Sequence, residues 1–146
     1  MKQRILTLDA NVFVAALKAG EKYSKKCTEI LRKIPDRFIL AEPSIVYQEV
    51  CGTLARRVGM DLARKAECYL DLMLHPKLVF ECSSSFCKAA YALCSEYRVY
   101  SVDALYLKVA LDTEAVLVSL DGRDFIDKVK HRNPPIEVYH VAEFPY

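Results

Sequence analysis

The feature that most constrains how this chain folds is the alternation of short, continuously apolar runs with longer segments of helical pattern. A strand that is apolar throughout is typical of a parallel sheet whose two faces are both covered by helices. The alternation therefore predicts an α/β fold, with three α/β/α layers built around a five-stranded parallel sheet. The predicted strands are residues 4–8, 37–41, 77–81, 115–119 and 136–141.

Glycine, proline and serine residues set the expected limits of the helices. Pro43 is expected to stop the second strand, and Gly59 to divide two consecutive helices. Ser44, Ser101 and the serine run 83–85 are expected N-caps, because a serine hydroxyl can accept a hydrogen bond from a backbone N–H of the first turn. Helices are predicted over residues 11–17, 23–34, 44–58, 60–75, 83–97, 101–113 and 122–132.

Length and composition favour one soluble domain. With 146 residues, 53% of them hydrophobic, the chain can bury one substantial core but is short for two, so we expect a single domain over residues 1–146. No apolar run approaches the roughly 18 residues of a membrane span, and the N-terminus lacks a signal-peptide pattern. We expect a cytoplasmic protein without a membrane partner.

The six cysteines form no CxxC pair and have no zinc-finger spacing with histidine. A structural zinc site therefore has little support. We expect buried free thiols, as is usual in a reducing compartment, rather than disulfides.

Two acids are expected at the carboxyl ends of strands, where ligand sites form in open parallel sheets. Asp9 follows the first predicted strand, and Asp121 follows the fourth. Either one alone is equally well explained as a cap or turn residue, because aspartate commonly fills those positions.

Glu49 and Asp103 fall on predicted helices. Glu49 lies on the apolar stripe of its helix, beside Val46 and Val50, where a carboxylate is costly unless a metal ion or a buried arginine compensates it. Asp103 falls in the first turn of its helix, where a lone acid is more typical of an interaction with the helix dipole. If these two converge with Asp9 and Asp121, the carboxylates suit Mg²⁺ or Mn²⁺ and point to phosphoryl chemistry.

Four motifs, taken in order, resemble a known family. They are Leu8-Asp9-Ala10-Asn11-Val12, then Glu49, then Ser101-Val102-Asp103-Ala104-Leu105, then Val118-Ser119-Leu120-Asp121-Gly122-Arg123-Asp124-Phe125. The ordered set resembles the PIN-domain family, and within it is similar to the small VapC-like toxin ribonucleases of prokaryotes. The match spans nearly the whole chain, and the set is more specific than any single motif.

This resemblance implies a Rossmann-like sheet of order 3-2-1-4-5 and an endoribonuclease that depends on one or two Mg²⁺ or Mn²⁺ ions. It also implies an RNA substrate, a homodimer and, for a toxin, an antitoxin partner. The acids at the family's catalytic and metal-binding positions are Asp9, Glu49, Asp103 and Asp121. The supporting positions are Asn11, Ser119 and Asp124, the last of which is equally typical of a solvated residue at a helix start.

Two other functions stay open at this point. One is an aspartyl-phosphate phosphatase, because an acid at the end of a first strand can act as a nucleophile. Asn11 disfavours it, since that chemistry needs a second acid at this position. The other is a non-catalytic RNA-binding or RNA-processing module, which would gain nothing from four carboxylates that repel one another.

Basic residues offer candidate contacts to RNA phosphates. The formal net charge is +2, but outside the four acids 21 basic residues face the other 15 of the 19 acidic ones. They concentrate in residues 22–37 and 56–65. Either stretch could steer phosphates, although a solvated helix face explains most individual lysines.

Overall fold

The structure is a computed structural model that describes residues 2–146. At its centre lies a five-stranded, fully parallel sheet of order β3-β2-β1-β4-β5, which confirms the predicted class and strand order. The strands are β1 (Arg4–Leu8), β2 (Phe38–Pro43), β3 (Leu74–Phe80), β4 (Val116–Ser119) and β5 (Val138–His140).

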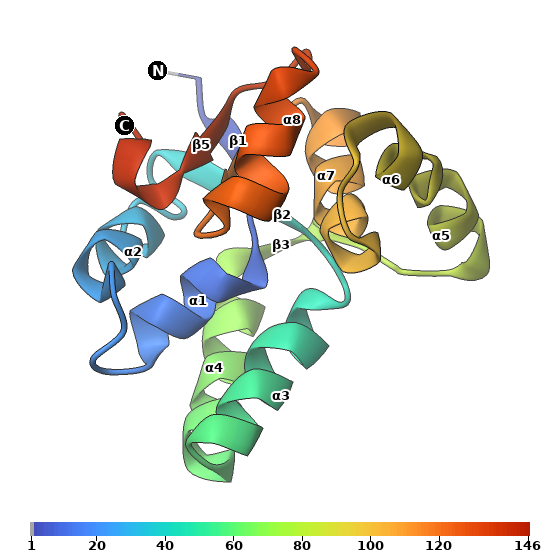
Figure 1. The fold of residues 1–146 in the computed structure, drawn as a ribbon. Helices are drawn as coiled ribbons and strands as arrows, with labels where there is room; N and C mark the ends of the chain where they lie inside the picture. Colours follow the sequence, from blue (N-terminus) through green and yellow to red (C-terminus); the bar gives the residue numbers. More distant parts are fainter. Residues whose placement is uncertain (1) are drawn as a thin grey trace.

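Helices connect every pair of consecutive strands (Figure 1). The α-helices are α1 (Ala10–Leu17), α2 (Ser24–Leu31), α3 (Val46–Arg57), α4 (Met60–Met73), α5 (Ser84–Ala90), α6 (Ala92–Tyr97), α7 (Ser101–Thr113) and α8 (Asp127–His131). A π-helical turn, η1 (Gly122–Ile126), precedes α8, and a 3₁₀ turn, η2 (Val141–Glu143), follows β5.

The helices form two layers because parallel crossovers are right-handed. The chain steps from β1 to β2 to β3 in one direction across the sheet, and from β3 back to β4 and β5 in the other. The first set, α1 to α4, therefore covers one face, and the second set, α5 to α8, covers the other. Within the first set, α3 and α4 pack as an antiparallel pair (Figure 1). Within the second set, α7 packs against β1, β2 and β4.

The sheet is buried on both faces at its centre. All four residues of β4 are buried, and Leu6, Leu8 and Leu117 are fully shielded from solvent. This burial explains why the central strands are apolar without alternation. The hydrophobic core is one continuous cluster that also takes in Phe13 and Tyr106 from α1 and α7.

The end of the second strand differs from the prediction. Strand β2 runs through Pro43 instead of stopping before it, so Glu42 lies inside the sheet. Ser44 does not cap the next helix. Ile45 is the N-cap residue and makes no side-chain cap bond, while the Ser44 hydroxyl accepts a hydrogen bond of 3.0 Å from Cys82 N. The serine thus ties the end of β2 to the segment after β3.

Strand β3 begins earlier than predicted and passes through Pro76. It is an edge strand, where a missing backbone N–H can face solvent without breaking the sheet ladder. Proline is therefore a misleading boundary here. Gly59, by contrast, does separate α3 from α4, with a φ of 150°.

Three later helix predictions also need correction. The helix predicted over 83–97 is divided at Tyr91, and the one predicted over 122–132 begins as the π turn η1. Ser83 does cap α5, through a 3.2 Å bond from Phe86 N. Ser101 is the first helical residue of α7 rather than its cap, which is Tyr100.

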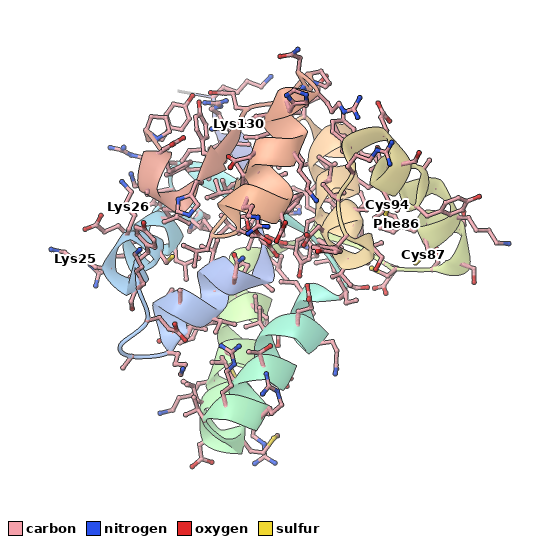
Figure 2. All side chains as sticks on the ribbon, viewed as in Figure 1. Lys25, Lys26, Phe86, Cys87, Cys94 and Lys130 are labelled. Carbon is pink, nitrogen blue, oxygen red and sulfur yellow. The ribbon has the colours of Figure 1, made fainter. Side chains whose placement is uncertain are left out.

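All six cysteines are free, in agreement with the expectation of thiols. Only Cys27 among them is buried, so the expectation of buried thiols is wrong for the other five. Cys87 and Cys94 lie on α5 and α6 near the surface (Figure 2). Within residues 2–146, no helix has both the length and the apolar character needed to cross a membrane.

Glu42 is an unexpected polar residue in the centre of the sheet. Its side chain is fully buried, and its Oε1 accepts a 2.7 Å hydrogen bond from Leu8 N. The register of the β1–β2 pair extends to Leu6 and Leu40, and beyond it the Glu42 side chain supplies the acceptor for Leu8 N. Its Oε2 has no partner among the described residues. Burial raises the pKa of Glu42 well above 4.5, which favours the neutral acid.

We expect Glu42→Gln to retain the fold and Glu42→Ala to lose about 2–4 kcal/mol of stability, because alanine leaves a cavity and an unpaired Leu8 N–H. The raised pKa of Glu42 means that the native state gives up its proton later than the unfolded chain. Wild-type stability should therefore fall with rising pH relative to Glu42→Gln. Urea unfolding at acidic and alkaline pH measures both effects, with Glu29→Gln on the exposed side of α2 as control. A glutamine variant as unstable as the alanine variant would contradict a neutral Glu42.

Candidate functional site

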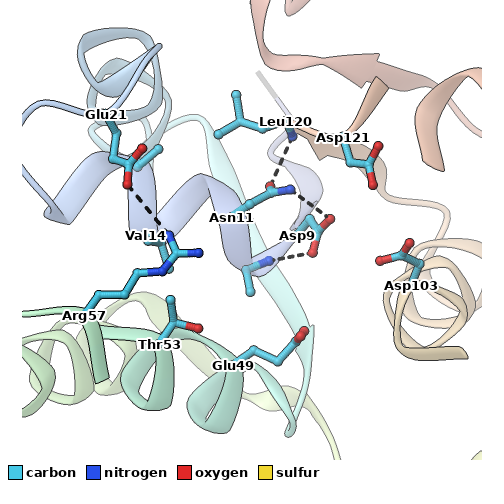
Figure 3. Close-up of a pocket in the computed structure, with 12 residues that line it drawn as sticks. Asp9, Asn11, Val14, Glu21, Glu49, Thr53, Arg57, Asp103, Leu120 and Asp121 are labelled. Carbon is cyan, nitrogen blue, oxygen red and sulfur yellow. Dashed lines mark hydrogen bonds and ion pairs between the residues drawn. The ribbon is translucent and has the colours of Figure 1, made fainter. Parts of the chain in front are cut away.

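Four acids predicted from the sequence line one cavity at the carboxyl edge of the sheet (Figure 3). Each comes from a different element. Asp9 joins β1 to α1, Glu49 lies in the first turn of α3, Asp103 lies in the first turn of α7, and Asp121 follows β4. The cavity has a volume of about 340 Å³. The fold thus brings all four together.

Asp9 is buried and is the most constrained of the four. It is the N-cap of α1, where its Oδ1 accepts a 2.8 Å bond from Ala10 N. Its Oδ2 accepts a 2.7 Å bond from the Ser119 hydroxyl and a 3.3 Å bond from Asn11 Nδ2. Asp9 can therefore cap α1 and line the cavity at the same time, because Oδ1 accepts the capping bond and Oδ2 accepts the bonds from Ser119 and Asn11.

Asn11 and Ser119 connect the first turn of α1 to the loop after β4. Asn11 Nδ2 donates to Ser119 Oγ at 3.2 Å, and Leu120 N donates to Asn11 Oδ1 at 3.1 Å. Asp121 N donates to Ser119 Oγ at 3.0 Å. These bonds fix the loop that carries Asp121 against the helix that carries Asp9. Asn11 and Ser119, two of the three supporting residues predicted from the sequence, therefore contact a cavity acid directly.

Asp121 and Asp124 have different surroundings. Asp121 Oδ1 accepts a 3.0 Å bond from Asp124 N and so caps η1. The carboxylate of Asp124 does not line the cavity and lies 4.0 Å from Lys128 Nζ. Asp124 thus has the geometry of a helix-start acid.

Glu49 does not have the buried arginine that the sequence left open as its partner. It is partly exposed, and within residues 2–146 it makes no ion pair. Arg57 lines the same cavity but pairs with Glu21, at 3.9 Å, and Lys18 pairs with the same Glu21 oxygen at 3.0 Å. Figure 3 shows Arg57 across the cavity from Asp103 and Asp121. The four acids therefore face one another with little cationic compensation.

This arrangement makes two of the carboxylates, those of Asp9 and Asp103, easier to protonate. Burial raises the pKa of Asp9 to about 6, the charges of Glu49 and Asp121 add to the rise, and the Ser119 hydrogen bond opposes it. Burial also raises the pKa of Asp103 to about 7, with Asp9, Asp121 and Glu49 contributing. A cation in the cavity would relieve this repulsion.

The donor set fits a hard divalent cation in charge and in chemistry, because carboxylate oxygens are the ligands that Mg²⁺ and Mn²⁺ prefer. Within residues 2–146, however, no three His, Cys, Asp or Glu side chains are arranged to hold a metal ion at once. The carboxylates line the cavity from several sides and would have to move closer together to share one ion.

Sequence reasoning did not place three polar residues in the cavity, although it named one of them, Arg57, in the basic stretch 56–65 as a candidate contact to RNA phosphates. Thr53 and Arg57 are four and eight positions after Glu49 on α3, and this helical spacing could have placed them on the same face. Glu21 follows a glycine after α1, and no pattern marks it. Lys25 and Lys26, from the first basic stretch, lie on the outer side of α2 (Figure 2).

Comparison with known proteins gives a family match and several similar folds. The family model of the PIN domain matches residues 6–131. No curated protein matches the sequence with significance.

Three solved structures share the fold. VapC20 of Mycobacterium tuberculosis, a sarcin–ricin loop cleaving toxin, has 18% identity and a TM-score of 0.67 over 82% of this chain and 91% of that chain. VapBC2 from Rickettsia felis, bound to a promoter DNA fragment, has 18% identity and a TM-score of 0.62 over 93% and 98%. FitAcB from Neisseria gonorrhoeae has 13% identity and a TM-score of 0.63 over 96% and 99%.

The raised pKa values of Asp9 and Asp103 predict a pH-dependent stability in EDTA. Between about pH 4 and pH 7 the native state holds protons that the unfolded chain has released. The free energy of unfolding contributed by these groups should therefore fall across that window and level off above it. Chemical denaturation at a series of pH values measures this fall.

Asp103→Asn should remove part of the fall and be at least as stable as wild type at neutral pH. The matched control is Asp61→Asn, because Asp61 is also an acid in the first turn of a helix, α4, but is exposed. The control should keep the pH dependence and lose about 0.3–1 kcal/mol of helix-dipole interaction. The same loss in Asp103→Asn would make Asp103 an ordinary helix-start acid.

Proposed function

Because the chain belongs to the PIN domain family, we propose that it is an endoribonuclease that hydrolyses RNA phosphodiester bonds with Mg²⁺ or Mn²⁺. The observation that carries this proposal is the convergence of Asp9, Glu49, Asp103 and Asp121 on one cavity from four separate elements. These four acids would hold one or two ions. When bound, such ions polarise the phosphate and activate the attacking water.

Residues in the cavity and beside it orient the acids. Ser119 and Asn11 direct hydrogen bonds at Asp9 Oδ2 and keep that carboxylate aimed toward the cavity. The capping bond from Asp124 N restrains Asp121 in the same way. Arg57 supplies a guanidinium that can contact a phosphate oxygen on the side opposite Asp103. Pre-set side chains of this kind lower the cost of ordering the site when substrate binds.

We further propose that the protein is the toxin of a toxin–antitoxin pair, acts in the cytoplasm and forms a homodimer. The family resemblance of the sequence supports an antitoxin partner. VapC20, whose fold is similar, is a toxin that cleaves the sarcin–ricin loop, which supports an RNA substrate here.

The phosphatase alternative finds no support in the site. Asn11, at the position where that chemistry needs a second acid, is fully used in bonds to Asp9, Ser119 and Leu120. A silent binding module also fits poorly, because burial and repulsion at Asp9 and Asp103 cost stability that such a module would not need.

We expect purified protein to cleave single-stranded RNA with Mg²⁺ or Mn²⁺, to leave 5′-phosphates and to stop in EDTA. Asp103→Asn and Asp121→Asn should abolish cleavage, because each removes a proposed ligand without changing the shape of the side chain. Added Mn²⁺ should raise the melting temperature of the wild type, because an ion that binds only the native state adds about 2.7 kcal/mol to the free energy of unfolding at a concentration of 100 times its Kd. The variants should gain less, because each lacks one proposed ligand.

Asp112→Asn is the matched control for Asp103→Asn. Asp112 lies on the same helix, but it is exposed and paired with Lys108 at 2.8 Å, so its loss should leave cleavage intact. Strong cleavage in EDTA, or products ending in a cyclic phosphate, would rule out the metal-dependent route. A covalent phosphate on Asp9 would instead support the phosphatase.

A further inference from the structure

A second hollow, of about 290 Å³, lies between the C-terminal end of α6 and helix α8. We call it the α6–α8 hollow. Four basic side chains line it, and among its lining residues one is acidic. Its lining residues are Tyr97, Arg98, Asp127, Lys128, His131 and Arg132.

Among residues 2–146, the two arginines of this hollow make no ion pair, and its lysine makes only a long one. Within the described chain, Arg98 and Arg132 take part in no ion pair, and Lys128 has one long contact of 4.0 Å with Asp124. Lys130, which is on the same helix α8, instead pairs with Glu143 at 3.1 Å. The hollow therefore carries positive charge that its own fold does not neutralise, as an anion-binding surface requires.

The hollow adjoins the acid cavity through Tyr100 and Lys128. Lys128 Nζ lies 5.5 Å above the centre of the Tyr100 ring, and it also faces Asp124, whose backbone N–H bonds Asp121. Tyr100 is 64% exposed and is the N-cap residue of α7, three positions before Asp103. Helix α8 lies beside α7 and α6 in Figure 1. An exposed aromatic ring thus separates the acids from the unpaired cations.

We propose that the α6–α8 hollow and Tyr100 bind the part of a single-stranded RNA that leaves the acid cavity on its Asp121 side. Arg98, Lys128 and Arg132 contact backbone phosphates, and the Tyr100 ring stacks on an unpaired base. This inference rests on the proposed ribonuclease function, of which it names a substrate subsite. The exposed ring favours a nucleic acid over an acidic protein segment, because it offers a face for a base beside cations for phosphates.

Binding of a short, fluorescein-labelled single-stranded RNA tests the cations, with Asp103→Asn in every protein to prevent cleavage. The double change Arg98→Gln/Arg132→Gln should weaken binding by at least about tenfold near 0.1 M salt. It should also reduce the slope of log K against log salt by about 1.4, or about 0.7 for each phosphate that is no longer neutralised. The control is Lys77→Gln/Lys88→Gln, which removes the same charge from exposed residues without an ion pair in the described chain. A slope equal to that of the control would overturn the proposal.

Tyr100 is tested by its own series in the same assay. Tyr100→Ala should weaken RNA binding by about tenfold, and Tyr100→Phe should restore it, because stacking needs the ring and not the hydroxyl. Tyr91→Ala is the matched control, since Tyr91 is 70% exposed but lies away from the hollow, between α5 and α6. A Tyr100→Ala protein that binds RNA like the control would overturn the stacking role.

The remaining outcomes separate this inference from the proposed function. If the wild type does not cleave RNA but the hollow variants lose RNA binding, the result would support the RNA-binding role of the hollow and reject the ribonuclease function. Cleavage by wild type with unchanged RNA binding in the hollow variants would reject the hollow alone. Binding of a polyglutamate peptide that depends on Arg98 and Arg132, with RNA binding unchanged, would assign the surface to an acidic protein segment and reject the proposal.

Discussion

The parallel pairing of β1 with β4 is the constraint on which the site depends. This pairing sets Leu8 beside Val118, so that the next residues along each strand, Asp9 and Ser119, meet although they are 110 positions apart in sequence. The order of the strands reverses at this pair, and the loops that follow the two strands diverge to opposite faces of the sheet. A cleft therefore opens between them without any special loop structure. The hydrogen bonds of Asn11 then hold the two loops at a fixed separation.

The fold concentrates its unfavourable polar features around this cleft. Asp9 and Asp103 have raised pKa values there, and two buried oxygens, Glu42 Oε2 and the Tyr106 hydroxyl, lack hydrogen-bond partners among the described residues. Burial raises the pKa of Tyr106 above its usual range, and the charges of Glu49 and Asp9 add to the rise. Elsewhere the core is apolar and continuous. Buried polar groups that lower the stability of a fold are expected at sites where the residues are selected for function.

The sequence is sufficient for the fold class and for the four acids that line the cavity, but not for several other details of the structure. Uninterrupted apolar strands indicate a parallel sheet, and the strand order comes from the resemblance of the ordered motifs to the PIN-domain family. The local pattern ends the second strand before Glu42, because a charged glutamate is not expected in a buried strand. The pattern does not show that this glutamate can be buried as a neutral acid. It also makes Pro76 a boundary, because the acceptability of this proline depends on whether the strand is at the edge of the sheet. The partner of Arg57 depends on a loop contact with Glu21, which helical spacing does not encode.

The charges around the cleft also place a condition on how a polyanion could enter it. Five carboxylates line the cavity, counting Glu21, against one guanidinium from Arg57, so an RNA phosphate that reaches the acids alone is repelled. Divalent ions held by the acids would turn this repulsion into attraction close to the cavity. The attraction would be short in range, because charges in solution are screened within about 8 Å at physiological salt. An RNA chain cleaved in this cavity would therefore need attraction from residues beyond the cavity before its scissile phosphate reached the acids. Among residues 2–146, Arg98 and Arg132 of the α6–α8 hollow make no ion pair, and these two side chains could supply that attraction to an RNA backbone.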